Sequence, residues 1–167
     1  MHRRRTKSLK NKNNMKLEQQ VCNLELAKRL KELGVKQESL FWWVQQVDEV
    51  PSKSGRHLPT YRPVDSWVVL DRLGEHGQKS IAALTVAELG ELLPYTIDNG
   101  RQLFNLQMFK CTGNFRDESR YSLEYNSILK DKNGAYEMEV QRGDESEADA
   151  RAKMLIYLLE NKLITLP

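Results

Sequence analysis

The chain has 167 residues and a net charge of +3, and 40% of its residues are hydrophobic while 29% are charged. These values are typical of one globular domain and exclude an intrinsically disordered protein. The sequence has no apolar run of the roughly 18 residues that a membrane span needs. It also lacks the apolar core of about 7–15 residues that a signal peptide needs, so we expect a cytoplasmic protein.

The net positive charge lies entirely in residues 1–14, which contain no acid. Residues 15–167 hold 20 cations (26 less 6) and 23 acids, a net charge of −3. A block of like charge without apolar periodicity predicts a disordered basic arm over 1–14, followed by a single domain over 15–167. Translation has two candidate starting points, Met1 and Met15. The cations of the arm are Arg3, Arg4, Arg5, Lys7, Lys10 and Lys12.

The first predicted helix covers residues 24–33. Asn23 is a suitable N-cap, Glu25 places an acid in the first turn, and Gly34 follows the last turn. The apolar residues recur at the helical spacing, at Leu26, Ala27, Leu30 and Leu33. We therefore expect a helix with one apolar face.

A helix-turn-helix centred on Gly34 is the alternative for this region. In that arrangement Leu30 occupies a position where the two helices need a small residue. The recognition helix would begin KQESLFWW, with aromatic residues where polar side chains are expected to contact DNA. We therefore favour a helix that runs into a strand.

Two short runs of aromatic and β-branched residues predict strands at 41–44 and 67–70. Neighbouring residues on a strand point to opposite faces, so Trp42 and Trp43 must lie on opposite sides of the sheet. Residues 48–65 contain three prolines and predict a long loop between these strands.

Turn residues at 72–79 predict a hairpin into a further strand at 81–84. Thr85 then begins a T-V-A-E capping box, which predicts a short helix that ends before Pro94.

The second half alternates apolar and polar residues, which predicts strands near 104–108, 121–125 and 136–140. Asn133-Gly134 predicts a hairpin between the last two. Ser146 and Asp149 form a second capping box that predicts a final helix, with an apolar stripe at Ala148, Ala152, Leu155, Leu159 and Leu163. The predicted fold class is α+β, with a mostly antiparallel sheet of five or six strands packed with three helices.

The sequence holds no catalytic or metal-binding motif. His2, His57 and His76 share no spacing that implies a common metal ion. Cys22 and Cys111 are too few and too far apart for a disulfide scaffold, and no base stands beside either of them in sequence. We therefore expect reduced thiols, no cofactor, no metal and no enzymatic activity.

Three segments resemble a known family: NLELAKRLKELGVKQESLFWWV (23–44), IAALTVAELGELLP (81–94) and SEADARAKMLIYLLENKLI (146–164). They resemble small proteins of unknown function carried by phages and by prophage-bearing bacterial genomes. The similarity covers most of residues 15–164, and this chain differs by its arm and by a longer 48–65 loop. The resemblance implies one intracellular domain and transfers no activity or site residue.

We expect a non-enzymatic accessory protein that binds an unidentified protein partner. Exposed aromatic residues are enriched at interfaces, so Trp42 or Trp43 is a candidate partner contact. Further candidate contacts in the 48–65 loop are Arg56, His57, Tyr61 and Arg62. The competing interpretation places the tryptophans in the core and leaves the loop as a solvated insertion. The alternative function is nucleic-acid binding through the basic arm and this loop, where cations stand next to aromatic residues.

Overall fold

The computed structural model describes residues 17–50, 60–74, 78–110, 121–130 and 136–166. These described residues form three α-helices, a short 3-10 helix and seven strands in two antiparallel sheets. The predicted α+β class is therefore confirmed, but the prediction of one sheet with five or six strands was wrong. The basic arm predicted over 1–14 lies outside the described residues.

The elements follow in the order helix, small sheet, helix, large sheet, helix. The helices are η1 (Leu17–Gln19), α1 (Leu24–Glu32), α2 (Val86–Leu92) and α3 (Glu147–Glu160). The three-stranded sheet has the order β2-β1-β3 and consists of β1 (Trp42–Val50), β2 (Thr60–Leu70) and β3 (Ser80–Ala82). The four-stranded sheet has the order β4-β5-β6-β7 and consists of β4 (Thr96–Asp98), β5 (Leu103–Lys110), β6 (Tyr121–Lys130) and β7 (Tyr136–Asp144).

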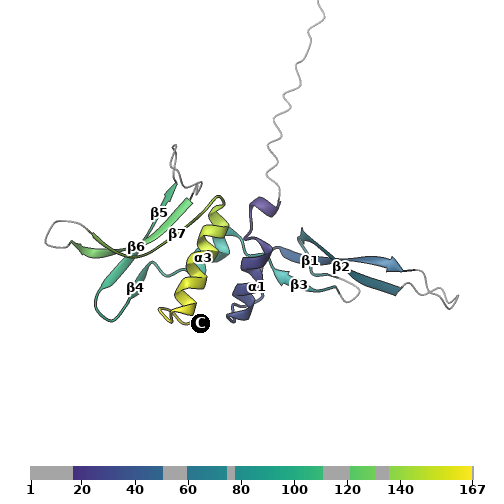
Figure 1. The fold of residues 1–167 in the computed structure, drawn as a ribbon, viewed down its shortest axis with the longest axis horizontal. Coiled ribbons are helices and arrows are strands. Elements are labelled where there is room, and N and C mark those ends of the chain that lie inside the picture. The colour runs from purple at the N-terminus through teal and green to yellow at the C-terminus, as the bar shows by residue number, and fades with distance from the viewer. Residues whose placement is uncertain (1–16, 51–59, 75–77, 111–120, 131–135, 167) are drawn as a thin grey trace, which may run out of the picture.

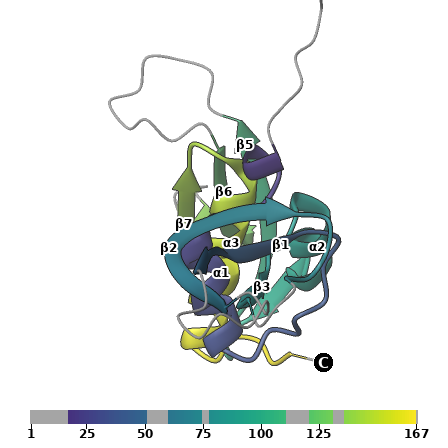
Figure 2. The ribbon, with the colours of Figure 1, turned by 90° about the vertical axis from the view of Figure 1, so that its right-hand side faces the viewer.

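The helices lie between the two sheets (Figure 1). α3 runs beside the four-stranded sheet, and α1 lies between α3 and the three-stranded sheet. The β1–β2 pair projects away from the helices, and Figure 2 views the molecule from that end. One cluster of buried residues includes Ala82 of the small sheet, Phe104 of the large sheet and Leu155 of α3. The two sheets therefore share one core.

Helix α1 begins and ends where its sequence predicts. The Leu26 N–H donates to Oδ1 of Asn23 at 3.0 Å, which confirms the N-cap. Gly34 has a φ of +88° just past the helix, a conformation that glycine adopts without strain. Residues 42–50 form a strand, so a helix-turn-helix is excluded and the predicted passage from helix to strand is confirmed.

Strands β1 and β2 are longer than predicted and include both ends of the 48–65 loop. β1 continues to Val50 and β2 begins at Thr60. Pro63 is tolerated because β2 is an edge strand, so a missing N–H need not break the ladder. Pro63 also lies opposite Val47, beside a shift of register. The prolines thus do not mark a loop along the whole segment.

The predicted hairpin between the second and third strands was wrong. β3 pairs with β1, on the side opposite β2, so its connection crosses the sheet. The connection packs closely on β1, because a Cβ on Gly74 would lie 2.8 Å from Cγ1 of Val44. The Gly74 N–H also donates to Oγ of Ser80 at 2.9 Å. A hairpin and a crossover use the same turn residues, so local sequence does not distinguish them.

Glu88 joins α2 to the segment that precedes β1. The predicted capping box is confirmed, because the Thr85 N–H donates to Oε2 of Glu88 at 2.7 Å and the Glu88 N–H donates to Oγ1 of Thr85. The Ser39 hydroxyl and the Leu40 N–H also donate to this carboxylate, each at 3.0 Å. Burial acts to raise the pKa of Glu88, but these hydrogen bonds outweigh burial and lower it.

The three predicted alternating segments form β5, β6 and β7, which pair in chain order. The Asn133-Gly134 turn lies outside the described residues. β4 pairs with β5 and was not predicted, although Asn99-Gly100 between them is a hairpin signal of the same kind. The amide of Asn99 organises this turn, since its Oδ1 accepts hydrogen bonds from the Arg101 and Gln102 N–H groups.

Helix α3 is buried on more sides than the predicted stripe. Ala150, Met154 and Leu158 are fully buried in addition to three residues of that stripe. The reason is its position, because α3 contacts β6 and β7 as well as α1 and α2. A helix that is covered all round needs apolar residues all round. None of the helices in the described part of the chain is long and apolar enough to cross a membrane.

The second predicted capping box is only half formed. The Asp149 N–H donates to Oγ of Ser146 at 3.0 Å, as predicted for the N-cap of α3. The Asp149 carboxylate, however, accepts a hydrogen bond from the Asn23 N–H at 2.7 Å, so it contacts the start of α1. Burial raises the pKa of Asp149, and the Asn23 hydrogen bond lowers it only in part.

Candidate interaction surface and polar cavity

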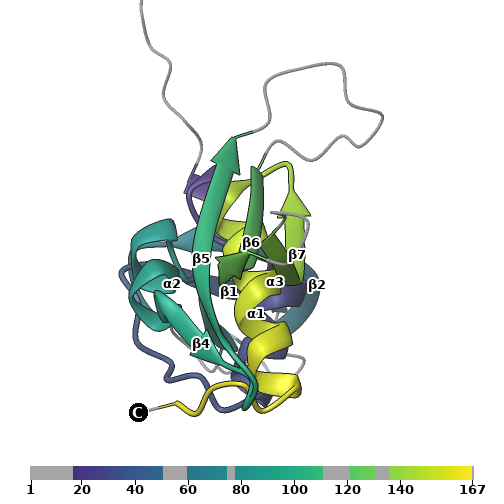
Figure 3. The same ribbon diagram turned by 90° about the vertical axis from the view of Figure 1, so that its left-hand side faces the viewer.

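The four-stranded sheet has one face against the helices and one face directed away from them. Phe104, Leu123 and Tyr125 lie on the inner face and are fully buried. Residues that alternate with them point to the opposite side, which we call the outer face. Figure 3 looks onto this side, where β5 crosses the front of the molecule with helices behind the sheet. The described side chains on the outer face include Thr96, Asp98, Leu103, Asn105, Gln107, Phe109, Ser122, Glu124, Asn126, Ile128, Met138 and Gln141.

Four large apolar side chains are exposed on the outer face. Leu103 and Phe109 are on β5, Ile128 is on β6 and Met138 is on β7, and their exposed fractions lie between 44% and 49%. Single exposed apolar residues are ordinary on a protein surface, whereas several on one sheet face indicate an interaction site. The outer face therefore has the apolar content of a binding surface.

Hydrogen bonds connect the polar side chains between these apolar residues. The Asn126 amide donates to Oε1 of Gln107 and to Oε2 of Glu124, each at 3.2 Å. The Gln141 amide donates to Oε1 of Glu124 and to Oγ of Ser122, each at 2.9 Å. The network spans β5, β6 and β7. Side chains held in this way have less conformational freedom to lose when a partner binds.

The charged residues among those named for the outer face are both acids. Glu124 lies in the middle row, between Gln107 and Gln141, and Asp98 lies at the β4 edge. Arg142 belongs to the inner face, where its guanidinium lies 4.3 Å from the centre of the Tyr157 ring. The described side chains of the outer face therefore combine four apolar residues with several amides and a weak negative charge.

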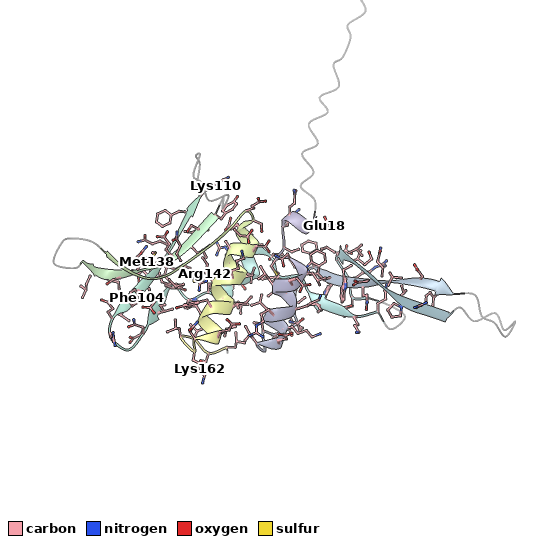
Figure 4. All side chains as sticks on the ribbon, viewed as in Figure 1. Glu18, Phe104, Lys110, Met138, Arg142 and Lys162 are labelled. Atoms are coloured by element: carbon pink, nitrogen blue, oxygen red, sulfur yellow. The ribbon has the colours of Figure 1, made fainter. Side chains whose placement is uncertain are left out.

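A polar cavity of about 670 Å³ opens beside the end of α3. Figure 4 marks this end by Lys162, and it shows Phe104 and Lys110 towards opposite ends of β5. Asn99 in the cavity wall donates to Oε2 of Glu139 at 2.9 Å. The lining residues are Asn99, Arg101, Gln102, Glu139, Tyr157, Asn161 and Leu163.

The cavity has the chemistry to hold a small polar molecule by hydrogen bonds. Its wall contributes three amide side chains, one cation and one acid, so its charges balance. Its lining residues include no cysteine, histidine or serine that could act as a nucleophile. Most ligand pockets are lined mainly by apolar groups, whereas this cavity is lined mainly by polar side chains. The outer face is therefore the stronger candidate for function.

The tryptophans predicted as partner contacts lie at the base of the β1–β2 pair. Trp42 and Trp43 are half-buried and pack against the core. The Trp43 indole N–H donates to the Cys22 carbonyl oxygen at 3.0 Å, and Lys28 lies 5.8 Å from the centre of the Trp67 ring. The indole groups therefore contribute to packing between α1 and the small sheet.

The other predicted contacts that the structure describes lie farther out on the same pair of strands. Tyr61 and Arg62 are opposite Glu49 and Asp48, seven and six residues along β1 from Trp42. At about 3.3 Å per residue this separation is roughly 20 Å, so the tryptophans and Tyr61–Arg62 do not form one patch. Arg56, His57 and the six cations of the arm lie outside the described residues.

Cys22 has the environment of an inert thiol. It is fully buried, and burial together with the nearby Asp149 carboxylate raises its pKa to about 12. The thiol is therefore protonated at neutral pH and is a poor nucleophile. Within the described ranges, no group of three or more histidine, cysteine or acidic residues is arranged to hold a metal ion. Cys111, His2, His57 and His76 lie outside those ranges.

The sequence carried a partial signal for the outer face. Leu103 and Phe109 alternate with the residues that predicted β5, so their common face follows from the period of two. Their exposure does not follow, because it depends on which side of the sheet α3 covers. Ile128 and Met138 share the same face only through the register of β6 and β7.

The chain matches no known protein family, no curated protein and no solved structure. The resemblance to phage-associated and prophage-associated proteins therefore stays a prediction.

Proposed function

We propose that this chain is a non-enzymatic protein-binding module that docks a partner on the outer face of its four-stranded sheet. The phage-type accessory proteins that its sequence resembles are the class to which we assign it. The observation that carries the proposal is the group of four exposed apolar residues on one sheet face, Leu103, Phe109, Ile128 and Met138.

Two further features support binding of a protein. Interface cores are depleted in charged residues, and the outer face has two acids among the twelve residues named above. Its amide network is already ordered, so a partner would find fixed donors and acceptors around apolar contacts. A chain that works by binding alone needs no nucleophile or metal.

The test is affinity capture from a lysate of the source cells, with nuclease present throughout. We expect the full chain to capture a protein, and the double variant Leu103→Ser, Phe109→Ser to lose it. Leu40→Ser is the matched control, since Leu40 is 71% exposed but belongs to the segment before β1. Capture that survives the double variant, or that Leu40→Ser removes equally, contradicts the proposal.

A further inference from the structure

Glu124 is the charged group nearest the middle of the outer face. Its two oxygens accept hydrogen bonds from the amides of Gln141 and Asn126, and the Ser122 hydroxyl donates to Oε1 at 3.4 Å. All of these donors are neutral. Among the described residues, no lysine or arginine forms an ion pair with Glu124, so neutral hydrogen-bond donors and solvent surround its partly exposed negative charge.

A partner seated on this face would remove that solvent. An ionised carboxylate that loses its water needs an opposite charge as well as hydrogen bonds, because neutral donors do not compensate for its desolvation. The partner must therefore supply a cation opposite Glu124. Arginine suits this position best, since its planar group can bond a carboxylate at two points and can also stack on an aromatic ring such as Phe109.

The same reasoning disfavours a second copy of this face as the occupant. Two outer faces packed together would bring Glu124 and Asp98 of each copy into one interface, and none of the described side chains named for that face is a cation. Like charges placed together in an interface oppose association. A different protein with a basic centre and apolar flanks fits the face, because the flanks match Leu103, Phe109 and Met138.

We propose that the partner of the outer face is a protein segment that presents an arginine or lysine to Glu124 between apolar side chains. This inference rests on the proposed function and adds the chemistry of the partner to it. Glu124→Gln is the informative variant, since glutamine keeps an acceptor oxygen in the network and removes only the charge.

The experiment is a selection of random 12-residue peptides displayed on phage, with the immobilised full chain as target. We expect the selected peptides to contain an arginine or lysine flanked by apolar residues. Their affinity, measured by fluorescence anisotropy, should fall about tenfold for Glu124→Gln and should be lost in Phe109→Ser. Glu91→Gln is the matched control, because it removes the same charge from an exposed position on α2.

The outcomes separate the two proposals. Peptides that require Phe109 but contain no cation, or that bind Glu124→Gln as well as the original chain, overturn the inference about the partner and leave the docking surface intact. An equal loss of peptide affinity in Glu91→Gln also overturns the inference, because the peptides would then be attracted by the total charge of the chain and not by Glu124. Peptides that bind Phe109→Ser as tightly as the original chain overturn the docking surface itself. A selection that enriches no peptide does so as well. Concentration-dependent dimers in sedimentation equilibrium that Phe109→Ser abolishes would assign the face to a second copy.

Discussion

The backbone N–H of Asn23 donates a 2.7 Å hydrogen bond to Oδ1 of Asp149, and these residues are 126 positions apart in the chain. Asn23 is the N-cap of α1, and Asp149 lies in the first turn of α3. One carboxylate thereby connects the beginnings of two helices that pack together.

Asp149→Ala should lower the free energy of unfolding by about 1–2 kcal/mol, because the Asn23 N–H loses a charged acceptor. Asp149→Asn keeps an acceptor oxygen and should cost less than half as much. Urea denaturation followed by circular dichroism at pH 7 measures both. Equal losses for the two variants would show that the hydrogen bond is not the source of the effect.

Glu88→Gln should lower the free energy of unfolding by about 1–2 kcal/mol at pH 7, because the carboxylate accepts hydrogen bonds from Thr85, Ser39 and Leu40. The folded-state pKa of Glu88 lies below its unfolded value, so this stabilisation is present above the unfolded pKa and is lost as pH falls through the folded pKa. The difference between the two proteins should therefore shrink in unfolding measurements at pH 3. A constant difference between pH 7 and pH 3 would contradict this account of Glu88.

Cys22 should resist alkylation in the folded protein. Its pKa of about 12 leaves almost no thiolate at pH 8, and burial blocks access to the sulfur. Iodoacetamide labelling followed by peptide mass spectrometry should show Cys22 modified only after urea is added. Labelling in the native state at the rate of a free thiol would place Cys22 at the surface.

Phe104 and Phe109 are on the same strand and should respond differently to truncation. Phe104 is fully buried on the inner face, so Phe104→Ala should cost about 3–5 kcal/mol. Phe109 is on the outer face, so Phe109→Ala should change stability by no more than about 0.5 kcal/mol. Thermal unfolding of the two variants gives the comparison. A large loss for Phe109→Ala would mean that the outer face is covered within the monomer.

Nucleic-acid binding should depend on the basic arm alone, because acids outnumber cations in residues 15–167. A variant of the full chain with all six arm cations changed to glutamine should lose any affinity for a duplex of random sequence. The unaltered chain should bind that duplex weakly, with affinity that falls steeply between 50 mM and 200 mM salt in fluorescence anisotropy. Affinity that persists in the variant would favour the nucleic-acid alternative for the domain.

The sequence predicted the elements whose signals are local. Asn23 and Thr85 cap their helices through neighbours three residues away, so the start of each helix could be read without knowing the fold. The period of two likewise predicted β5, β6 and β7. Asp149 was assigned to a local capping box in the same way, and its contact with Asn23 depends on how α1 and α3 pack.

The pairing of β3 and the exposure of individual side chains could not be predicted, because they depend on residues far apart in sequence. β3 adds to β1 across the sheet from β2, and nothing in the turn residues of 72–79 distinguishes this path from a hairpin. The partner contacts predicted at Trp42 and Trp43 depended on the exposure of their rings, which α1 and the core partly cover. The exposed face of the four-stranded sheet could be identified only from the position of α3, which covers the opposite face.

The position of α3 determines whether either half of the chain could fold without the other. The residues before Pro94 supply α1, α2 and the small sheet, while the residues after it supply the large sheet and α3. Because α3 fills the space between α1, α2 and the inner face of β6 and β7, neither half closes its own apolar surface. Both halves contribute to one hydrophobic core, so we expect that cutting the chain at Pro94 would expose apolar surface on each of them.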